Sequence, residues 1–211
     1  MRLAKDTTMT TISPLELWNL SWESCAKDVD LTNARVGGRA TKENPNKEDA
    51  DWWQKNGPQW VSDYINWRQN NPQWKIWKTP QGVKAVELEV NPTIGGVEVK
   101  MFVDRVFDVN GTLVIVDLKT SSRTPDSDLQ LGFYKVGIEK QLGVTINHGA
   151  YWMSRKQSMT ETLDLSRYTL DTIEYMARNF DVARKSGIFL PNLSSCGFCG
   201  LAEHCTFKKE K

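Results

Sequence analysis

The sequence has no long apolar run and no strong excess of either charge. Its longest apolar stretches, such as Leu113 to Val116, are far shorter than the roughly 20 residues that a helix needs to cross a bilayer. The start of the chain, Met1 to Asp6, runs into threonines without the apolar segment of a secretory signal. The net charge is only +1, which excludes a globally basic protein that coats nucleic acid by bulk attraction. We therefore expect a cytoplasmic protein with no membrane partner.

Cysteine is also scarce, and internal repeats and low-complexity tracts are missing. The chain has 4 cysteines, of which three lie together at Cys196, Cys199 and Cys205. In a reducing compartment, clustered cysteines indicate metal binding rather than disulfides. What remains is an ordinary globular composition of 211 residues, 39% hydrophobic and 25% charged, which can bury the core of one domain.

The periodicity of the chain changes from helical to alternating and back. It predicts a polar loop over 35–50, strands over 84–90, 97–109, 112–119 and 145–153, and helices over 17–27, 50–70, 127–142 and 169–185. This order predicts an α/β (α+β) fold with a mixed β-sheet flanked by helices. We expect one domain over 1–211, with a helical part at 1–80, a catalytic sheet and helix at 84–154, and a helix and cysteine tail at 165–211.

Tryptophan is unusually frequent, with 9 residues. Trp53, Trp60, Tyr64 and Trp67 recur at helical spacing, interrupted by Gly57-Pro58. An aromatic helix face packed on the core is the favoured interpretation. A platform that stacks nucleic-acid bases is the alternative, and it requires that the rings be exposed.

Asn110-Gly111 lies between two strand-like segments, which is the strongest short signal for a β-hairpin. If these residues form a two-residue turn, Val109 pairs with Thr112, and the same register places Asp104 opposite Asp117. Side chains at such positions have Cβ atoms about 4.5–5.5 Å apart. Lys119, two residues beyond Asp117, shares its face.

Two facing carboxylates are the ligands that Mg²⁺ or Mn²⁺ prefers, with the other positions left to water and a substrate phosphate. Glu87 or Glu89 on the preceding strand would add a further ligand. Such a metal holds a water nucleophile, and a nearby lysine orients or deprotonates that water or stabilises the phosphoryl oxygens. The alternative is a solvated sheet face with a surface ion pair between Asp117 and Lys119.

The segments Met101-Phe102-Val103-Asp104-Arg105-Val106 and Val114-Ile115-Val116-Asp117-Leu118-Lys119-Thr120 resemble the core of the PD-(D/E)XK nuclease superfamily. They resemble most its RecB-type branch, which includes CRISPR-associated exonucleases and the nuclease domains of AddAB helicases. That branch also carries a Q-x-x-x-Y motif, which matches Gln130 and Tyr134. The resemblance implies a restriction-endonuclease-like fold, Asp104 and Asp117 as metal ligands, Lys119 as the catalytic lysine, and Gln130 and Tyr134 as supporting residues.

The function that this resemblance implies is that of a metal-dependent DNA exonuclease. Its substrate would be DNA that is single-stranded or has free ends, and its role would lie in recombination, repair or phage DNA processing. A helicase or recombination protein is the expected protein partner. The cytoplasm of a bacterium or of a phage-infected cell is the expected location.

The cysteine tail has the pattern C-x2-C-x5-C. Two-residue spacing lets both sulfurs reach one metal centre, so Zn²⁺ with His204 or Cys25 as fourth ligand is one interpretation, and unligated thiols are another. In the RecB-type branch, a lone N-terminal cysteine and such a tail bind a [4Fe–4S] cluster that ties the ends of the domain together. The resemblance therefore implies a cluster on Cys25, Cys196, Cys199 and Cys205.

The N-terminal part departs from the pattern of the family. Its members carry an early histidine that helps to bind metal, whereas the only histidines here are His148 and His204, and the nearest glycine-rich segment is 38–41. Cys25 is followed by neither the proline nor the basic residues that are usual in the family. Either Cys25 is a divergent ligand, or the chain lacks an N-terminal segment that its relatives possess. The alternatives to a nuclease are a catalytically impaired DNA- or partner-binding module of the same fold, and a zinc-stapled structural protein.

Overall fold

The computed structural model describes residues 12–32, 37–38, 40–43, 45, 47–189, 191–192, 196 and 199–207. The helices and short helical turns are α1 (Pro14–Ala26), α2 (Ala50–Asn70), α3 (Leu129–Leu142), η1 (Ser154–Lys156), α4 (Leu170–Lys185) and η3 (Ala202–His204). The strands are β1 (Trp74–Ile76), β2 (Val86–Val90), β3 (Thr93–Ile94), β4 (Val97–Glu98), β5 (Met101–Val109), β6 (Thr112–Lys119), β7 (His148–Met153), β8 (Ser158–Met159) and β9 (Leu163–Asp164). Within the described residues, no helix is long and apolar enough to cross a membrane.

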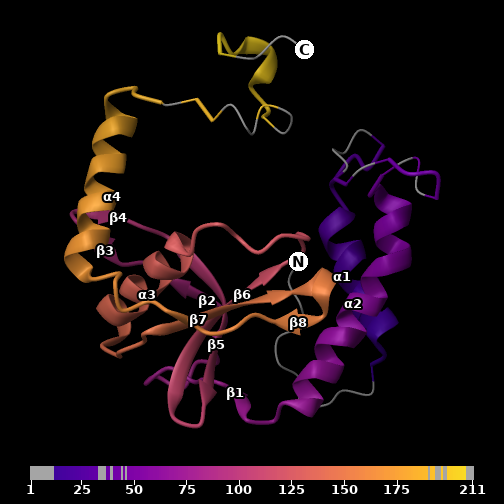
Figure 1. The fold of residues 1–211 in the computed structure, drawn as a ribbon, viewed down its shortest axis with the longest axis horizontal. Helices are drawn as coiled ribbons and strands as arrows, with labels where there is room; N and C mark the ends of the chain where they lie inside the picture. Colours follow the sequence, from indigo (N-terminus) through magenta and orange to yellow (C-terminus); the bar gives the residue numbers. More distant parts are fainter. Residues whose placement is uncertain are drawn as a thin grey trace.

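A mixed sheet of seven strands forms the centre of the molecule, in the order β1-β5-β6-β7-β8, with β2 paired to β5 and β9 to β7. Strands β6 and β7 are parallel, and the other neighbours are antiparallel. In Figure 1, α1 and α2 lie on one side of this sheet, and α3 and α4 lie on the other. The predicted mixed α/β fold with flanking helices is confirmed.

Helix α2 packs on one face of the sheet through its aromatic residues. Tyr64 is 8% exposed and belongs to a buried cluster with Phe107 and Trp152, against which Trp67 packs. The predicted packed aromatic face is therefore correct for the second half of the helix. In the first half, Trp53 and Trp60 are half-buried and meet edge to face with ring centroids 5.1 Å apart.

Helix α2 continues through Gly57-Pro58, where the sequence had predicted an interruption. The reason is tertiary packing. A Cβ on Gly57 would lie 2.1 Å from the ring of Trp18, so the missing side chain leaves room for this tryptophan of α1. Trp18 is 4% exposed and donates from its indole nitrogen to Gln54 Oε1 at 2.9 Å. This burial offsets the backbone hydrogen bond that proline removes.

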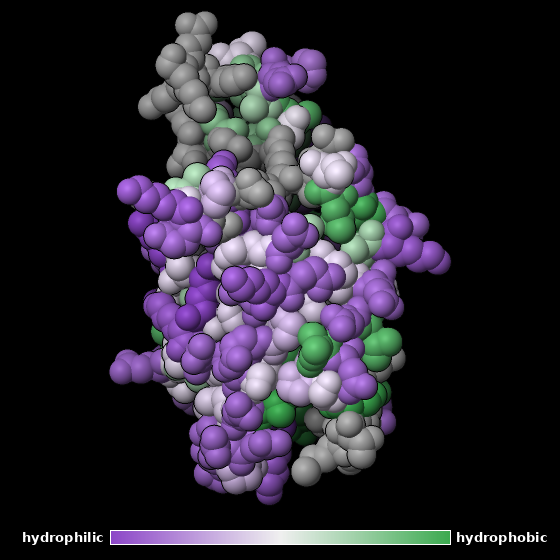
Figure 2. All heavy atoms as spheres, turned by 90° about the vertical axis from the view of Figure 1, so that its right-hand side faces the viewer, coloured by the Kyte–Doolittle hydropathy of each residue, from purple (hydrophilic) through white to green (hydrophobic). Residues whose placement is uncertain are grey.

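The outer face of the two helices is mostly hydrophilic, with separate apolar patches (Figure 2).

Helices α3 and α4 cover the other side through a second cluster, which includes Leu88, Val103, Ile115, Leu131, Val136 and Ile173. Helix α4 is only partly buried. Ile173 and Ala177 are buried, whereas Met176 and Phe180 are 38% and 72% exposed. Among the described residues, its main contacts are with α3 and with the separate two-stranded sheet of β3 and β4, so only a narrow stripe of the helix is covered.

Most predicted boundaries hold within a few residues, and the differences have local causes. The segment 97–109 is not one strand. It is divided into β4 and β5, and β4 turns back on β3. Helix α3 ends at Gly143, as predicted, with a left-handed φ of 68° that glycine adopts without strain. The sequence did not predict the short strands β1, β8 and β9, because they lack a recognisable alternating pattern.

Candidate active site

The predicted hairpin forms in the predicted register. Asn110 and Gly111 have φ angles of 54° and 88°, as a tight hairpin turn with two left-handed residues requires. Val109 lies opposite Thr112, and the pairing continues without a break to Arg105 opposite Val116. This register brings Asp104 and Asp117 to the next position, directly beyond the last pair of the ladder.

At Asp104 the side chain replaces the regular backbone pairing. Its Oδ2 accepts a hydrogen bond of 2.7 Å from the backbone nitrogen of Leu118. Its own carbonyl oxygen accepts from Arg105 Nη1 at 2.5 Å. Across from it on β2, Glu87 has a φ of 49°, an unusual left-handed conformation for glutamate. Strand β2 thus leaves regular geometry beside Asp104, and the pairing of β5 with β6 ends at the point where the Asp104 carboxylate is held.

Asp117 is a buried carboxylate that is only partly compensated. Its side chain is 4% exposed, and Lys119 Nζ lies 2.6 Å from its Oδ2. That oxygen nevertheless has no partner in hydrogen-bond geometry. Burial raises the pKa of Asp117, the hydrogen-bonding contact with Lys119 opposes this, and the nearby charge of Asp104 raises it further. A buried acceptor with a raised pKa, beside a second carboxylate, favours a bound cation.

Lys119 is held between the sheet and helix α3. Its Nζ donates to Gln130 Oε1 at 2.9 Å, and Gln130 Nε2 donates to the hydroxyl of Tyr134 at 2.8 Å. Gln130 and Tyr134 are four residues apart and therefore share one face of α3. A continuous row of contacts, which we call the site row, thus joins Asp117, Lys119, Gln130 and Tyr134.

Tyr134 lies close to all the acidic residues of this region. Its pKa is raised, first by burial and then by the charges of Asp117, Asp104 and Glu87, while Gln130 opposes the shift. The predicted site residues Asp104, Asp117, Lys119, Gln130 and Tyr134 are therefore brought together, with Glu87 at their side.

The two candidate glutamates of β2 are placed differently. Glu87 Oε1 lies 3.6 Å from Arg105 Nη1, at the edge of the site. Glu89 is held by other partners: its Oε1 forms an ion pair of 2.8 Å with Lys100 and accepts from Asn91 Nδ2 at 2.9 Å. These two contacts lower the pKa of Glu89. Of the two, only Glu87 is positioned to approach a metal near Asp104.

The start of α3, which carries Gln130, is anchored by residues that the sequence analysis did not single out. Asp128 accepts from the Arg167 guanidinium and from the hydroxyl of Tyr168. The ring of Tyr168 lies 2.5 Å from where a Cβ on Gly132 would be, so the helix rests on that ring. No local motif signals these contacts, because Asp128 and Tyr168 are 40 residues apart.

Arg155 of η1 anchors the other side of the site. Its Nε donates to the carbonyl of Thr120 at 2.7 Å, directly after Lys119, and its Nη2 lies 2.6 Å from Glu48 Oε2. Its guanidinium also covers the rings of Trp52 and Trp60 at 5.3 and 5.2 Å. The parallel pairing of β6 with β7 explains the contact, since it places Lys119 beside Met153. Sequence alone gave no sign of it.

The cysteines are not gathered into one site. Cys25 is exposed on α1, Cys196, Cys199 and Cys205 are half-buried in the tail, and none of these four forms a disulfide. Across the ranges given above, no three side chains of His, Cys, Asp or Glu are grouped so as to hold a metal ion. Among these residues, the four cysteines predicted to bind one cluster are not brought together, and neither histidine belongs to the site row.

The carboxylates of the site suit Mg²⁺ better than a metal that needs a full protein cage. Mg²⁺ binds through one or two carboxylates and keeps several waters or substrate oxygens. Asp104 and Asp117 supply these two hard donors, and Oδ2 of Asp117, which lies 2.6 Å from the Lys119 ammonium, is the buried oxygen that would ligate the ion. The residues present therefore fit this ion.

Comparisons with known proteins agree with this geometry. The model of the PD-(D/E)XK nuclease superfamily matches residues 20–206. The Gene 69 protein of Mycobacterium phage D29 is 30% identical over 87% of this chain and 78% of the relative. The Gene 69 protein of Mycobacterium phage L5 is 32% identical over 57% of this chain and 44% of the relative.

A solved structure is also similar, the crystal structure of SSO0001. It has 15% sequence identity and a TM-score of 0.43, and the match covers 99% of this chain and 91% of that one. A score this low carries no further argument. The family match and the mixed sheet with flanking helices agree with a restriction-endonuclease-like fold. The chain belongs to the PD-(D/E)XK nuclease superfamily.

Proposed function

We propose that the protein is a Mg²⁺- or Mn²⁺-dependent DNA exonuclease of the RecB type. The observation that carries this proposal is the site row: a buried carboxylate, a lysine, a glutamine and a tyrosine in continuous contact beside a second carboxylate. The Q-x-x-x-Y pair supports the RecB type, since Gln130 accepts a hydrogen bond directly from Lys119. DNA processing in a phage-infected cell agrees with the two phage relatives.

In this proposal Asp104 and Asp117 hold the metal, and Glu87 adjusts the charge at its edge. The metal, when bound, supplies a water of lowered pKa and neutralises charge on the scissile phosphate. Lys119 Nζ, 25% exposed, is positioned to donate to a phosphate oxygen or to orient the attacking water. Gln130 accepts a hydrogen bond from that ammonium group and donates one to the hydroxyl of Tyr134, so the two residues fix the direction of the Lys119 side chain.

The chemistry requires that Lys119 change partners. Before metal binding its ammonium compensates Asp117, the carboxylate that burial disfavours as an ion. Lys119 would no longer be needed for this compensation if Asp117 held a cation, and it could then contact the substrate while keeping its hydrogen bond to Gln130. The 2.6 Å ion pair is therefore interpreted as the resting arrangement of the site.

An end-labelling experiment tests the proposal. Single- and double-stranded DNA with a 5′ or 3′ label, and a closed circle of the same sequence, are incubated with the protein and Mg²⁺ or Mn²⁺. Release of short products from linear DNA only is expected, and it is lost in Asp117→Ala. Cutting of the circle would show an endonuclease instead. Metal-independent DNA binding without cleavage would support the impaired binding module.

The [4Fe–4S] cluster remains part of the proposal as a structural element. Its support is the C-x2-C-x5-C spacing of cysteines that form no disulfide, and no step of the chemistry depends on it. Iron and acid-labile sulfide, measured on anaerobically purified protein, should reach about four each per chain if the cluster forms. Zinc at one per chain would indicate the alternative site.

A further inference from the structure

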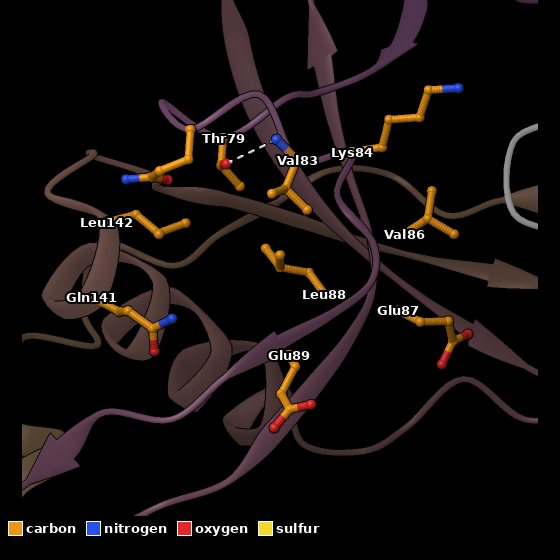
Figure 3. Close-up of a pocket in the computed structure, with 10 residues that line it drawn as sticks. Thr79, Val83, Lys84, Val86, Glu87, Leu88, Glu89, Gln141 and Leu142 are labelled. Atoms are coloured by element: carbon orange, nitrogen blue, oxygen red, sulfur yellow. Dashed lines mark hydrogen bonds between the residues drawn. The ribbon is translucent and has the colours of Figure 1, made fainter.

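A pocket of about 420 Å³ lies on strand β2 beside the site. It is enclosed by the loop that precedes β2 and by the C-terminal end of α3 (Figure 3). Leu88 lies at its centre, with Val83 from the loop and Leu142 from α3 on either side (Figure 3). Leu88 is 8% exposed and Val83 is 54% exposed, so the pocket has an apolar floor and an accessible apolar wall.

The pocket is continuous with the candidate active site through Glu87. This residue lines the pocket and also lies 3.6 Å from Arg105, whose Nη1 donates to the carbonyl of Asp104. The charge of Glu87 also reaches Tyr134. On α3, Gln141 follows Tyr134 by two turns, about 10.5 Å along the helix axis. Stacked DNA spans that distance in about three nucleotides, and an unstacked strand in fewer.

The chemistry of the lining suits a nucleobase rather than a phosphate. Aliphatic side chains contact the flat faces of a base, and Gln81 and Gln141 offer amide groups to its edge. Gln141 is held in place, because its Oε1 accepts from the backbone nitrogen of Asn91 at 2.6 Å. The described lining has one lysine and no arginine, and its two glutamates, Glu87 and Glu89, are paired with Arg105 and Lys100, so it offers little positive charge to a phosphate.

We propose that this pocket takes up one unpaired nucleobase of the DNA strand that is being cut. The proposal rests on the proposed nuclease function and adds to it a reason for acting on unpaired DNA. A base in a duplex enters only at the cost of its pairing and stacking, so an unpaired base enters more readily. The pocket thus selects single-stranded or frayed ends near the scissile phosphate.

An abasic scan combined with one substitution tests this. A labelled oligothymidylate and a series lacking one base at successive positions are titrated with protein in EDTA, and the affinity is read by fluorescence anisotropy. Loss of the base that occupies the pocket is expected to weaken binding about 5-fold, the lower limit for bases stacked on aromatic rings, because the pocket is lined by aliphatic side chains. The other positions lose less.

Val83→Glu places a charge in the pocket, and Val182→Glu is its matched control, since the two valines are 54% and 56% exposed. In Val83→Glu, the loss of DNA affinity at one particular abasic position should disappear, whereas Val182→Glu should keep it. Circular dichroism should show that both variants are folded. An abasic scan without a preferred position, or an unchanged preference in Val83→Glu, would overturn the pocket. If the scan shows the preferred position but the protein cleaves no DNA with Mg²⁺ or Mn²⁺, the nuclease proposal fails and the pocket stands.

Discussion

Replacing Asp117 with asparagine should stabilise the protein while abolishing its activity. Asp117 is 4% exposed, its Oδ2 has no partner in hydrogen-bond geometry, and Asp104 adds a second negative charge nearby. Asparagine has the same shape without the charge. The variant Asp117→Asn therefore removes an unfavourable buried ion at neutral pH, at the expense of a metal ligand.

The expected magnitude follows from the burial of that group. A buried carboxylate that is only partly compensated costs about 1–3 kcal/mol more than a neutral amide of the same shape, and the contact with Lys119 offsets part of this. We expect a gain in the free energy of unfolding of about 1–2 kcal/mol at pH 7. For a chain of this length, that raises the Tm by about 2–8 °C.

The pH dependence has a definite sign. The folded pKa of Asp117 is raised above its ordinary value of 3.8, so the folded state keeps the proton longer than the unfolded state does. The stability that protonated Asp117 contributes is complete below pH 3.8 and is lost as the pH rises through the folded pKa. The gain in the free energy of unfolding of Asp117→Asn over the wild type is therefore small near pH 4 and grows toward pH 7.

Thermal or urea unfolding at several pH values, without divalent metal, measures this difference. Carboxyl groups whose pKa is lowered, such as Asp181, contribute the opposite slope, but they are the same in both proteins and cancel. Asp126→Asn, in an exposed loop, serves as the control and should change little. Mg²⁺ should then stabilise the wild type alone. If Asp117→Asn is less stable than the wild type at pH 7, our account of this carboxylate is wrong.

Three further substitutions test the site and its supports. Gln130→Ala should lower the rate of cleavage about 10- to 150-fold with little change in DNA affinity, because it removes a hydrogen bond of 2.9 Å to the Lys119 ammonium; an equal loss of affinity would argue against this. Arg155→Ala should lower the free energy of unfolding by about 1–3 kcal/mol in urea titrations, since it leaves Glu48 without its 2.6 Å ion pair, and an unchanged midpoint would contradict this. Gly57→Ala should lower the free energy of unfolding by about 1–3 kcal/mol in thermal melts, because its Cβ would lie 2.1 Å from the Trp18 ring. Gly82→Ala has open space around its Cβ and is a partial control for the loss of a glycine, since its φ is positive.

The centre of the site was predictable because its determinants are local. Asn110-Gly111 fixes the turn, the turn fixes the register, and the register brings Asp104 and Asp117 to one place. Likewise, a spacing of four residues puts Gln130 and Tyr134 on one helix face. These are properties of short segments, and the structure reproduces them as contacts.

The supports of the site were not predictable, because they depend on long-range packing. Arg155 meets Glu48 across 107 residues, and the contact exists only because α2 lies against the sheet near η1. The continuation of α2 through Pro58 depends on Trp18 from another helix. The left-handed conformation of Glu87, which turns it toward the site, has no sequence signal of its own.

The hairpin and the helix that follows it carry almost the whole site within residues 104–134. Contacts between residues close in the chain cost little loop-closure entropy and form early in folding. The reactive groups are therefore expected to assemble first, as one short unit, with α1 and α2 docking onto it afterwards. Such an order would leave the outer helices free to diverge among relatives while the chemistry stays in place, and hydrogen exchange during refolding would show it as early protection of β5 and β6.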